Sequence, residues 1–144
     1  MNEFDHRGES KKEFVRYIFN DISKTYDFLN HFLSFGIDII WRKRFIKALN
    51  LCDNDIVLDV ATGTGDIAFE IRKKYKSKII GLDLSVNMLE IAKQKAKNKK
   101  IEDIKFIEGD AENLPFEDNT FDKVVISYGL RNLGNTEKGI EEFC

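Results

Sequence analysis

The sequence has few of the residues that mark disulfide frameworks, zinc sites or flexible linkers. Its 144 residues include two cysteines, Cys52 and Cys144, and one proline. Two cysteines so far apart indicate neither a disulfide framework nor a zinc site, which favours a reducing compartment. One proline argues against low-complexity linkers. We therefore predict no metal site and no covalent cross-link.

Charge and hydrophobic runs exclude further classes of protein. The formal net charge is −2, so there is no basic excess that would indicate a nucleic-acid partner. No apolar run approaches the roughly 20 residues that span a bilayer. The polar N-terminus MNEFDHRGESKKEF lacks the apolar core of a signal peptide. With 42% hydrophobic and 33% charged residues, the chain is expected to be a folded cytoplasmic protein.

From residue 56 onward, short apolar strands alternate with amphipathic helical patterns. The expected strands cover 56–60, 78–83, 105–108 and 122–128. The expected helices cover 66–75 and 85–97, and a third begins near 135. This alternation predicts an α/β fold of the Rossmann-like type, with helices on both faces of a parallel sheet. Ligands of such sheets bind beyond the carboxyl ends of the strands, so the loops that follow these strands should be functional.

The N-terminal third has a helical pattern without strands. Large apolar residues recur at helical spacing from Phe14 to Ile22, and two further helices are expected on either side of Ser34-Phe35-Gly36. We therefore predict a helical lid or substrate region at 1–50 and a cofactor-binding domain at 51–144. The aromatic residues of the lid are expected first of all to belong to helix cores: Phe28, Phe32, Phe35 and Trp41.

The stretch LDVATGTGDIAFE, residues 58–70, contains a glycine turn between a strand and a helix. Gly63 and Gly65 with Ala68 match the dinucleotide pattern loosely, which alone is weak evidence. A tight turn that merely needs residues without a Cβ penalty would look the same. A nicotinamide dinucleotide and S-adenosylmethionine are both candidate ligands.

Acidic residues at the strand ends separate these two ligands. Asp83 ends the second strand and could accept hydrogen bonds from both ribose hydroxyls of either ligand. After the third strand, Asp110 could accept the adenine amino group while the Ala111 amide donates to a ring nitrogen. Asp59 inside the first strand and Asp66 at the helix start would oppose a pyrophosphate. These carboxylates favour the cationic sulfonium of S-adenosylmethionine over NAD.

Five stretches of the chain carry a family resemblance. VLDVATGTGD, GLDLSVNML, GDAENLPF and VISYGLRNL resemble successive motifs of class I S-adenosylmethionine-dependent methyltransferases. With YDFLNHFLSFGID and SYGLRN, the chain is similar, more narrowly, to the ubiquinone/menaquinone-biosynthesis C-methyltransferases. The resemblance runs from about Val15 to Phe143. Thr62 before the glycine turn and Gly134-Asn135 after RNL depart from common family patterns.

The resemblance implies a set of cofactor-binding residues. The glycine turn would wrap the methionine part of S-adenosylmethionine, and the second strand end would hold the ribose. The loop after the third strand would read adenine, and the end of the fourth strand would face the reacting methyl group. In that order the residues are Gly63, Thr64 and Gly65; Asp83; Asp110 and Ala111; and Ser127. Asp59 would orient the glycine loop or contact the amino group through water.

The resemblance also implies methylation of a ring carbon of a polyprenylated quinol, with demethylmenaquinol as the preferred substrate. Arg131 and Asn132 are candidates for a polar clamp on the phenolate. Tyr26 and Asp27 are candidates for the proton acceptor or for groups that orient the ring. Two alternatives stay open at this point: a methyltransferase for another small molecule, and a non-catalytic S-adenosylmethionine-binding module.

A polyprenylated substrate raises the question of contact with a membrane. An apolar lid flanked by Arg42-Lys43-Arg44 would suit a peripheral contact with the inner face of a membrane, or a channel for a prenyl tail.

A complete sheet of this class has seven strands, and the chain reaches the fourth. VVIS would then be an uncovered apolar edge. We expect a truncated chain, or a partner such as a second copy that completes the sheet.

Overall fold

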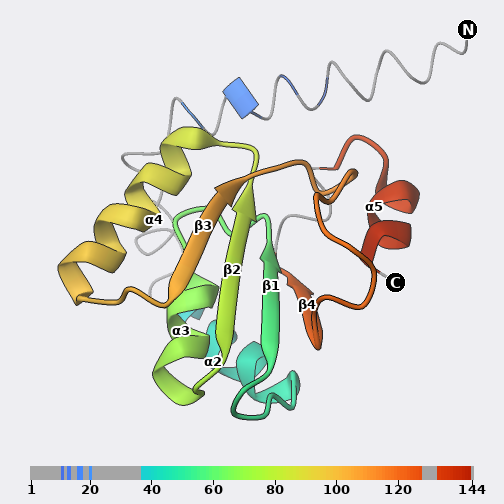
Figure 1. Cartoon of the computed structure of the whole chain (residues 1–144). Coiled ribbons are helices and arrows are strands. Elements are labelled where there is room, and N and C mark those ends of the chain that lie inside the picture. Colours follow the sequence, from blue (N-terminus) through green and yellow to red (C-terminus); the bar gives the residue numbers. More distant parts are fainter. Residues whose placement is uncertain are drawn as a thin grey trace, which may run out of the picture.

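The computed structural model describes Lys11, Glu13, Arg16, Tyr17, Asn20, residues 37–127 and residues 133–143 (Figure 1). Its central element is a parallel sheet of β1 (Ile56–Val60), β2 (Lys78–Asp83), β3 (Ile104–Glu108) and β4 (Lys123–Ile126). The strand order is β3-β2-β1-β4, and each neighbouring pair is parallel. The chain therefore has the predicted Rossmann-like α/β fold, and the order reverses between β1 and β4.

The two faces of the sheet carry separate apolar clusters, because successive strand residues point to opposite sides. One cluster joins Val57, Ile79 and Val125 to the buried sides of α2 (Ile37–Ala48), α3 (Asp66–Lys74) and α4 (Val86–Lys99). The other joins Leu58 and Leu82 to residues after β3 and to Phe143 of α5 (Thr136–Phe143). In Figure 1, α3 and α4 lie on one side of the sheet and α5 lies beyond β4. Helices thus cover both faces, as predicted.

Helix α4 illustrates how local signals set these elements. It begins after Ser85, whose hydroxyl accepts a hydrogen bond from the Met88 amide at 3.3 Å. It ends at Lys100, which adopts the left-handed conformation. The four residues predicted to face inward are buried: Met88, Leu89, Ala92 and Ala96. The hydrophobic period therefore located this helix to within two residues at its C-terminal end.

Helix α2 contradicts one prediction. Ile46 is fully buried against α3, but Trp41 is 57% exposed and is not a core residue. The two lie five positions apart, which places them on roughly opposite sides of a helix with 3.6 residues per turn. Phe28, Phe32 and Phe35 lie outside the described residues. The predicted boundary at residue 50 stays a prediction, although Ile46 packs into the same cluster as β1 and α3.

The sheet ends at β3 on one side and at β4 on the other within the part of the chain that the structure describes. Strand β4 is shorter than the predicted 122–128, because Ser127 already lies in a bend. Val124 and Ile126 of β4 are only partly buried, although both pack against the second apolar cluster. No described helix is long and apolar enough to cross a membrane.

Candidate cofactor site

The turn after β1 has an unusual backbone conformation. Ala61, Gly63 and Gly65 all have positive φ, at 55°, 58° and 87°. The Thr62 amide donates to the Leu82 carbonyl at 3.0 Å, and the Gly65 amide donates to the Thr62 carbonyl at 2.9 Å. The turn is therefore anchored to β2 before it enters α3. Ala61 carries a left-handed backbone without the freedom of glycine, which costs roughly 1–2 kcal/mol.

The two glycines of the turn serve different purposes. A Cβ on Gly65 would come within 2.9 Å of the Phe106 ring and 3.0 Å of the Phe69 ring, so Gly65 is required by packing. A Cβ on Gly63 would meet nothing within 4 Å. The turn therefore presents an open stretch of backbone at Gly63. This is the feature that a closely approaching ligand needs.

Asp83 connects the glycine turn to the start of α4. One carboxylate oxygen accepts a hydrogen bond from the Gly63 amide at 2.8 Å, and the other accepts one from the Ser85 amide at 2.8 Å. Its carbonyl accepts from the Gly109 amide at 3.0 Å, which brings the loop after β3 alongside. Burial raises the pKa of Asp83, while the backbone amides of Ser85, Gly63 and Leu84 oppose that shift. A carboxylate has about four acceptor positions, so Asp83 can still accept a hydrogen bond from a ribose hydroxyl.

Asp59 lies beneath the turn and is 1% exposed. Its carboxylate accepts a hydrogen bond from the Thr62 hydroxyl at 2.7 Å. Burial, with the nearby charge of Asp83, raises the pKa of Asp59 to about 7, although the Thr62 hydroxyl lowers it. This contact supports the role of orienting the loop, the first of the two roles predicted for Asp59. It also gives Thr62, which departs from the family pattern, a structural function.

The remaining cofactor candidates also lie at the carboxyl ends of the strands. Asp110 accepts the Glu112 amide on its carboxylate at 2.9 Å, which shapes the loop after β3. Ala111 is buried in this loop. Ser127 directly follows β4, whose last residue pairs with Val60 of β1. The structure therefore brings all eight predicted cofactor residues to one end of the sheet.

The substrate candidates cannot be placed in the same way. Arg131 and Asn132 lie outside the described residues, and so do Tyr26 and Asp27. The described N-terminal residues nevertheless contact the carboxyl end of the sheet. Arg16 pairs with Glu108 at 2.7 Å, Asn20 accepts from the Ser85 hydroxyl at 2.5 Å, and Lys11 donates to the Leu133 carbonyl at 3.0 Å. Arg16 and Asn20 therefore lie against the loops at the strand ends.

Sequence reasoning missed several charged residues that support the site. Asp66 was expected to add negative charge, but it forms ion pairs with Arg42 of α2 and Lys95 of α4. Arg42 is therefore part of an internal network and not of a membrane-binding surface. Glu112, which is buried, accepts the Asn135 amide at 2.5 Å and fixes the segment before α5. The spacing of Asp38 and Arg42, four residues apart on one helix, was the available signal.

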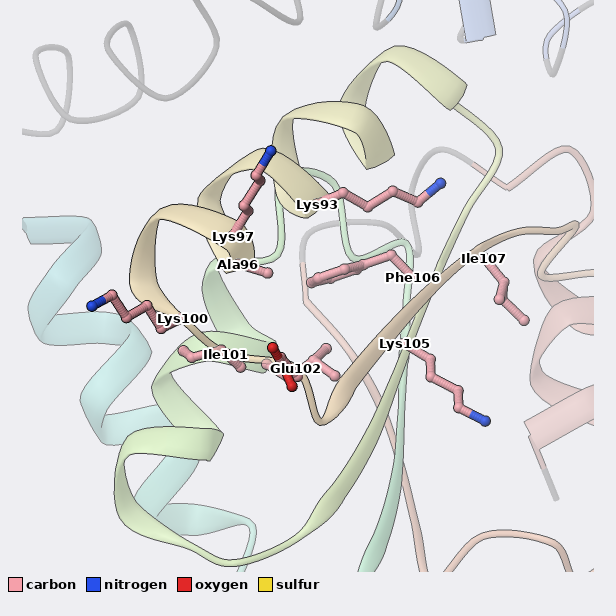
Figure 2. Close-up of a pocket in the computed structure, with 10 residues that line it drawn as sticks. Lys93, Ala96, Lys97, Lys100, Ile101, Glu102, Lys105, Phe106 and Ile107 are labelled. Carbon is pink, nitrogen blue, oxygen red and sulfur yellow. The ribbon is translucent and has the colours of Figure 1, made fainter.

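A hollow lies between α4 and β3, and none of the predicted cofactor residues lines it. It has a volume of about 700 Å³ and an apolar floor that includes Ile104 and Phe106. Figure 2 shows that the amino groups of Lys93, Lys97 and Lys105 point in different directions. These amino groups do not converge on one point as the ligands of an anion would. The strand ends are therefore the better candidate site.

Comparison with solved structures first identifies the fold. The chain superposes on a putative S-adenosyl-L-methionine-dependent methyltransferase from Methanococcus maripaludis with a TM-score of 0.75. The match covers 85% of this chain and 56% of that one, at 23% identity, and it shows the shared fold. The fold is therefore that of class I methyltransferases.

Sequence comparison then gives the family. Residues 7–144 match the ubiE/COQ5 methyltransferase family, and the chain belongs to it. It is 42% identical over 135 residues to the demethylmenaquinone methyltransferase of Porphyromonas gingivalis, covering 92% of this chain and 55% of that protein. It is 43% identical over 136 residues to the demethylmenaquinone methyltransferase of Thermotoga maritima, covering 94% of this chain and 57% of that protein. The chain thus spans about half the length of these relatives. Family membership implies S-adenosyl-L-methionine as the cofactor.

Proposed function

We propose that the protein methylates a ring carbon of a polyprenylated quinol, with demethylmenaquinol as substrate and S-adenosyl-L-methionine as methyl donor. The observation that carries this proposal is the match to the ubiE/COQ5 family over residues 7–144. Two relatives above 40% identity are named demethylmenaquinone methyltransferases, which favours the naphthoquinol over a benzoquinol. A methyltransferase of another pathway, or a non-catalytic module, is correspondingly disfavoured.

The residues at the strand ends fit this cofactor. When bound, S-adenosyl-L-methionine supplies an electrophilic methyl group. The open backbone at Gly63 can lie against the methionine part, beside Thr64 and Gly65, and Asp83 can accept the ribose hydroxyls through its remaining lone pairs. Asp110 and Ala111 would hold adenine, and Ser127 would face the transferred methyl group. Such positioning of the reactants can contribute roughly 7–11 kcal/mol to catalysis.

Alanine substitution should mainly weaken ligand binding at Gly63 and mainly lower the stability of the fold at Gly65. Gly63→Ala adds a methyl group into open space at φ 58°, so it should cost only about 1–2 kcal/mol of stability and yet weaken S-adenosylhomocysteine binding about tenfold or more. Gly65→Ala forces a Cβ against Phe106 and Phe69, so it should lower the free energy of unfolding by about 2–4 kcal/mol. Urea unfolding and calorimetric titration of both variants measure this contrast. Equal affinity losses in two equally stable variants would contradict it.

The quinol must lose a proton before its ring carbon becomes nucleophilic. Arg131 and Asn132 follow β4 in the sequence and are proposed to stabilise the phenolate. Tyr26 and Asp27 are proposed to accept the proton or to orient the ring. Arg131→Ala is expected to lower the turnover number about 100-fold or more while S-adenosylhomocysteine affinity changes less than twofold. Single-turnover kinetics beside calorimetry checks this, and full turnover would remove Arg131 from the clamp.

The outer side of α2 supports contact with a membrane surface, where a polyprenylated substrate resides. Ile37, Ile40 and Trp41 are each more than half exposed, and Lys43 and Lys47 are exposed beside them. An apolar stripe with flanking cations is typical of helices that bind anionic lipid surfaces. Flotation with anionic liposomes at low salt should recover the protein, and Trp41→Ser should reduce recovery. Absence of binding by the unaltered protein would remove this part of the proposal.

The proposed location is the cytoplasm, with binding to the inner face of the membrane. A homodimer is one proposed way to cover the outer edge of β4. The division into a lid at 1–50 and a cofactor domain at 51–144 is proposed with them. Contacts of Arg16 and Asn20 with the strand ends support the lid. Sedimentation velocity would separate a homodimer from a monomer.

A methyl-transfer assay with two quinols tests which substrate the protein methylates. The full chain would be incubated with labelled S-adenosyl-L-methionine and either demethylmenaquinol or 2-polyprenyl-6-methoxy-benzoquinol, each as the reduced quinol. The proposal predicts label in the naphthoquinol product, with a rate for the benzoquinol at least tenfold lower. A higher rate for the benzoquinol would overturn the choice of ring. Transfer to neither, by a protein that binds S-adenosylhomocysteine, would favour the non-catalytic alternative.

A further inference from the structure

Asp66, the first residue of α3, is held between two cations from different helices. One carboxylate oxygen accepts from Arg42 Nη1 of α2 at 2.5 Å. The other accepts from Lys95 Nζ of α4 at 2.9 Å. The side chains of Arg42 and Lys95 are only 20% and 25% exposed, so these charged hydrogen bonds are partly protected from water. Asp66 follows Gly65 directly, so the carboxylate marks the end of the glycine turn.

Lys95 also contacts the turn itself. Its amino group lies 3.1 Å from Thr64 Oγ1 and 3.3 Å from the Thr64 carbonyl oxygen. Thr64 lies between the two glycines and is buried. The glycines on both sides have many accessible backbone conformations, so without further contacts the position of Thr64 would be poorly fixed. A single ammonium group that binds Thr64 and Asp66 together therefore restricts the turn to the conformation that leaves Gly63 open.

Arg42 carries the same network to the N-terminal part of the chain. Its second nitrogen, Nη2, donates to Asp38 one turn earlier on α2 at 3.0 Å. Among the residues that the structure describes, Arg42 pairs with Asp38 and Asp66, so it acts on the turn through Asp66. The position of α2 is thereby linked to the shape of the turn. Helices α2, α3 and α4 meet at one carboxylate.

We propose that Lys95 and Arg42 are positioning residues for the cofactor turn, with Asp66 as the shared group through which α2 and α4 hold it. This inference rests on the proposed function, because it assumes that the turn binds S-adenosyl-L-methionine. Lys95 acts on Thr64 directly and on the helix start through Asp66. Arg42 stabilises the same arrangement from α2. Losing either cation frees the turn without removing any group that touches the cofactor.

Calorimetric titration with S-adenosylhomocysteine tests this in the full chain. Lys95→Met should weaken binding about tenfold or more, and Arg42→Met about threefold to tenfold. The affinity of the double variant should fall by less than the product of the two single-variant factors, because both cations share Asp66. Lys95→Arg, which keeps the charge, should recover most of the affinity. In steady-state assays the KM for the methyl donor should rise while kcat changes less than twofold.

Lys93→Met is the matched control, since Lys93 lies on the same helix and pairs with the exposed Glu90 on the protein surface. It should bind within twofold of the unaltered protein. If the unaltered protein does not bind S-adenosylhomocysteine, the proposed function fails. If it binds and Lys95→Met behaves like Lys93→Met, this inference alone is overturned. Should Lys95→Met fail to fold, Asp66→Asn keeps the shape of the residue and must show the same selective loss of affinity; unchanged affinity there also overturns it.

Discussion

Replacing Asp83 with alanine is expected to weaken S-adenosylhomocysteine binding at least 100-fold, or about 2.7 kcal/mol. The substitution removes the acceptor proposed for the ribose hydroxyls. It also leaves the Gly63 and Ser85 amides without the carboxylate that accepts from both at 2.8 Å. Each charge-assisted hydrogen bond of this kind contributes roughly 1.5–3 kcal/mol. Calorimetric titration of the variant and the unaltered protein measures the loss.

Asp103 provides the control for this prediction. It is an exposed carboxylate that pairs with Arg72 before β3, away from the glycine turn. Asp103→Ala should change the affinity less than twofold, because it removes one surface ion pair. An Asp83→Ala protein that folds and binds like Asp103→Ala would show that the carboxylate has no part in the cofactor site. The shape of the cofactor site could then not be attributed to the hydrogen bonds through which Asp83 joins β2 to the glycine turn.

Asp59→Asn is expected to stabilise the fold at neutral and alkaline pH. The pKa of Asp59 is raised from 3.8 to about 7, so the folded state holds this proton more tightly than the unfolded state does. The stability that the protonated carboxyl confers is complete below about pH 4 and is lost as pH rises to about 7. The gain from Asp59→Asn should therefore be larger at pH 8 than at pH 4.5, by on the order of 3 kcal/mol.

Urea unfolding at the two pH values gives this difference. Asparagine can still accept the hydrogen bond from the Thr62 hydroxyl, which leaves the anchoring contact in place. Asp55→Asn is a suitable control, since Asp55 is a less buried carboxylate of the loop before β1. A gain that is equal at both pH values would mean that Asp59 is ionised in the folded protein throughout this range. Burial would then not be the dominant influence on its pKa.

The elements of the sheet could be predicted because their signals are local. β1 and β2 were located to the residue, and the inward face of α4 followed from its hydrophobic period. The strand order then placed the predicted cofactor residues at one end, as expected for parallel strands. The position of Trp41 could not be predicted in this way. Which side of α2 is buried depends on how the helix packs against α3, and its composition is apolar on several sides.

The electrostatics of the site were the least predictable part. The carboxylates of Asp59 and Asp66 pointed to a cationic ligand when only the sequence was considered. In the structure Asp66 is neutralised by Arg42 and Lys95, and burial favours the protonated form of Asp59. Ion pairs between residues 24 and 29 positions apart leave no pattern in the sequence. Asp83, the open Gly63 and family membership therefore support this ligand more strongly than the total charge of the site does.

Binding of S-adenosyl-L-methionine at the carboxyl end of this sheet is tested most directly by calorimetric titration of the full chain with S-adenosylhomocysteine and, separately, with NADH. We expect saturable one-to-one binding of S-adenosylhomocysteine that Asp83→Ala weakens at least 100-fold, and no measurable heat from NADH. Binding of NADH without binding of S-adenosylhomocysteine would show that this end of the sheet is not a site for S-adenosyl-L-methionine.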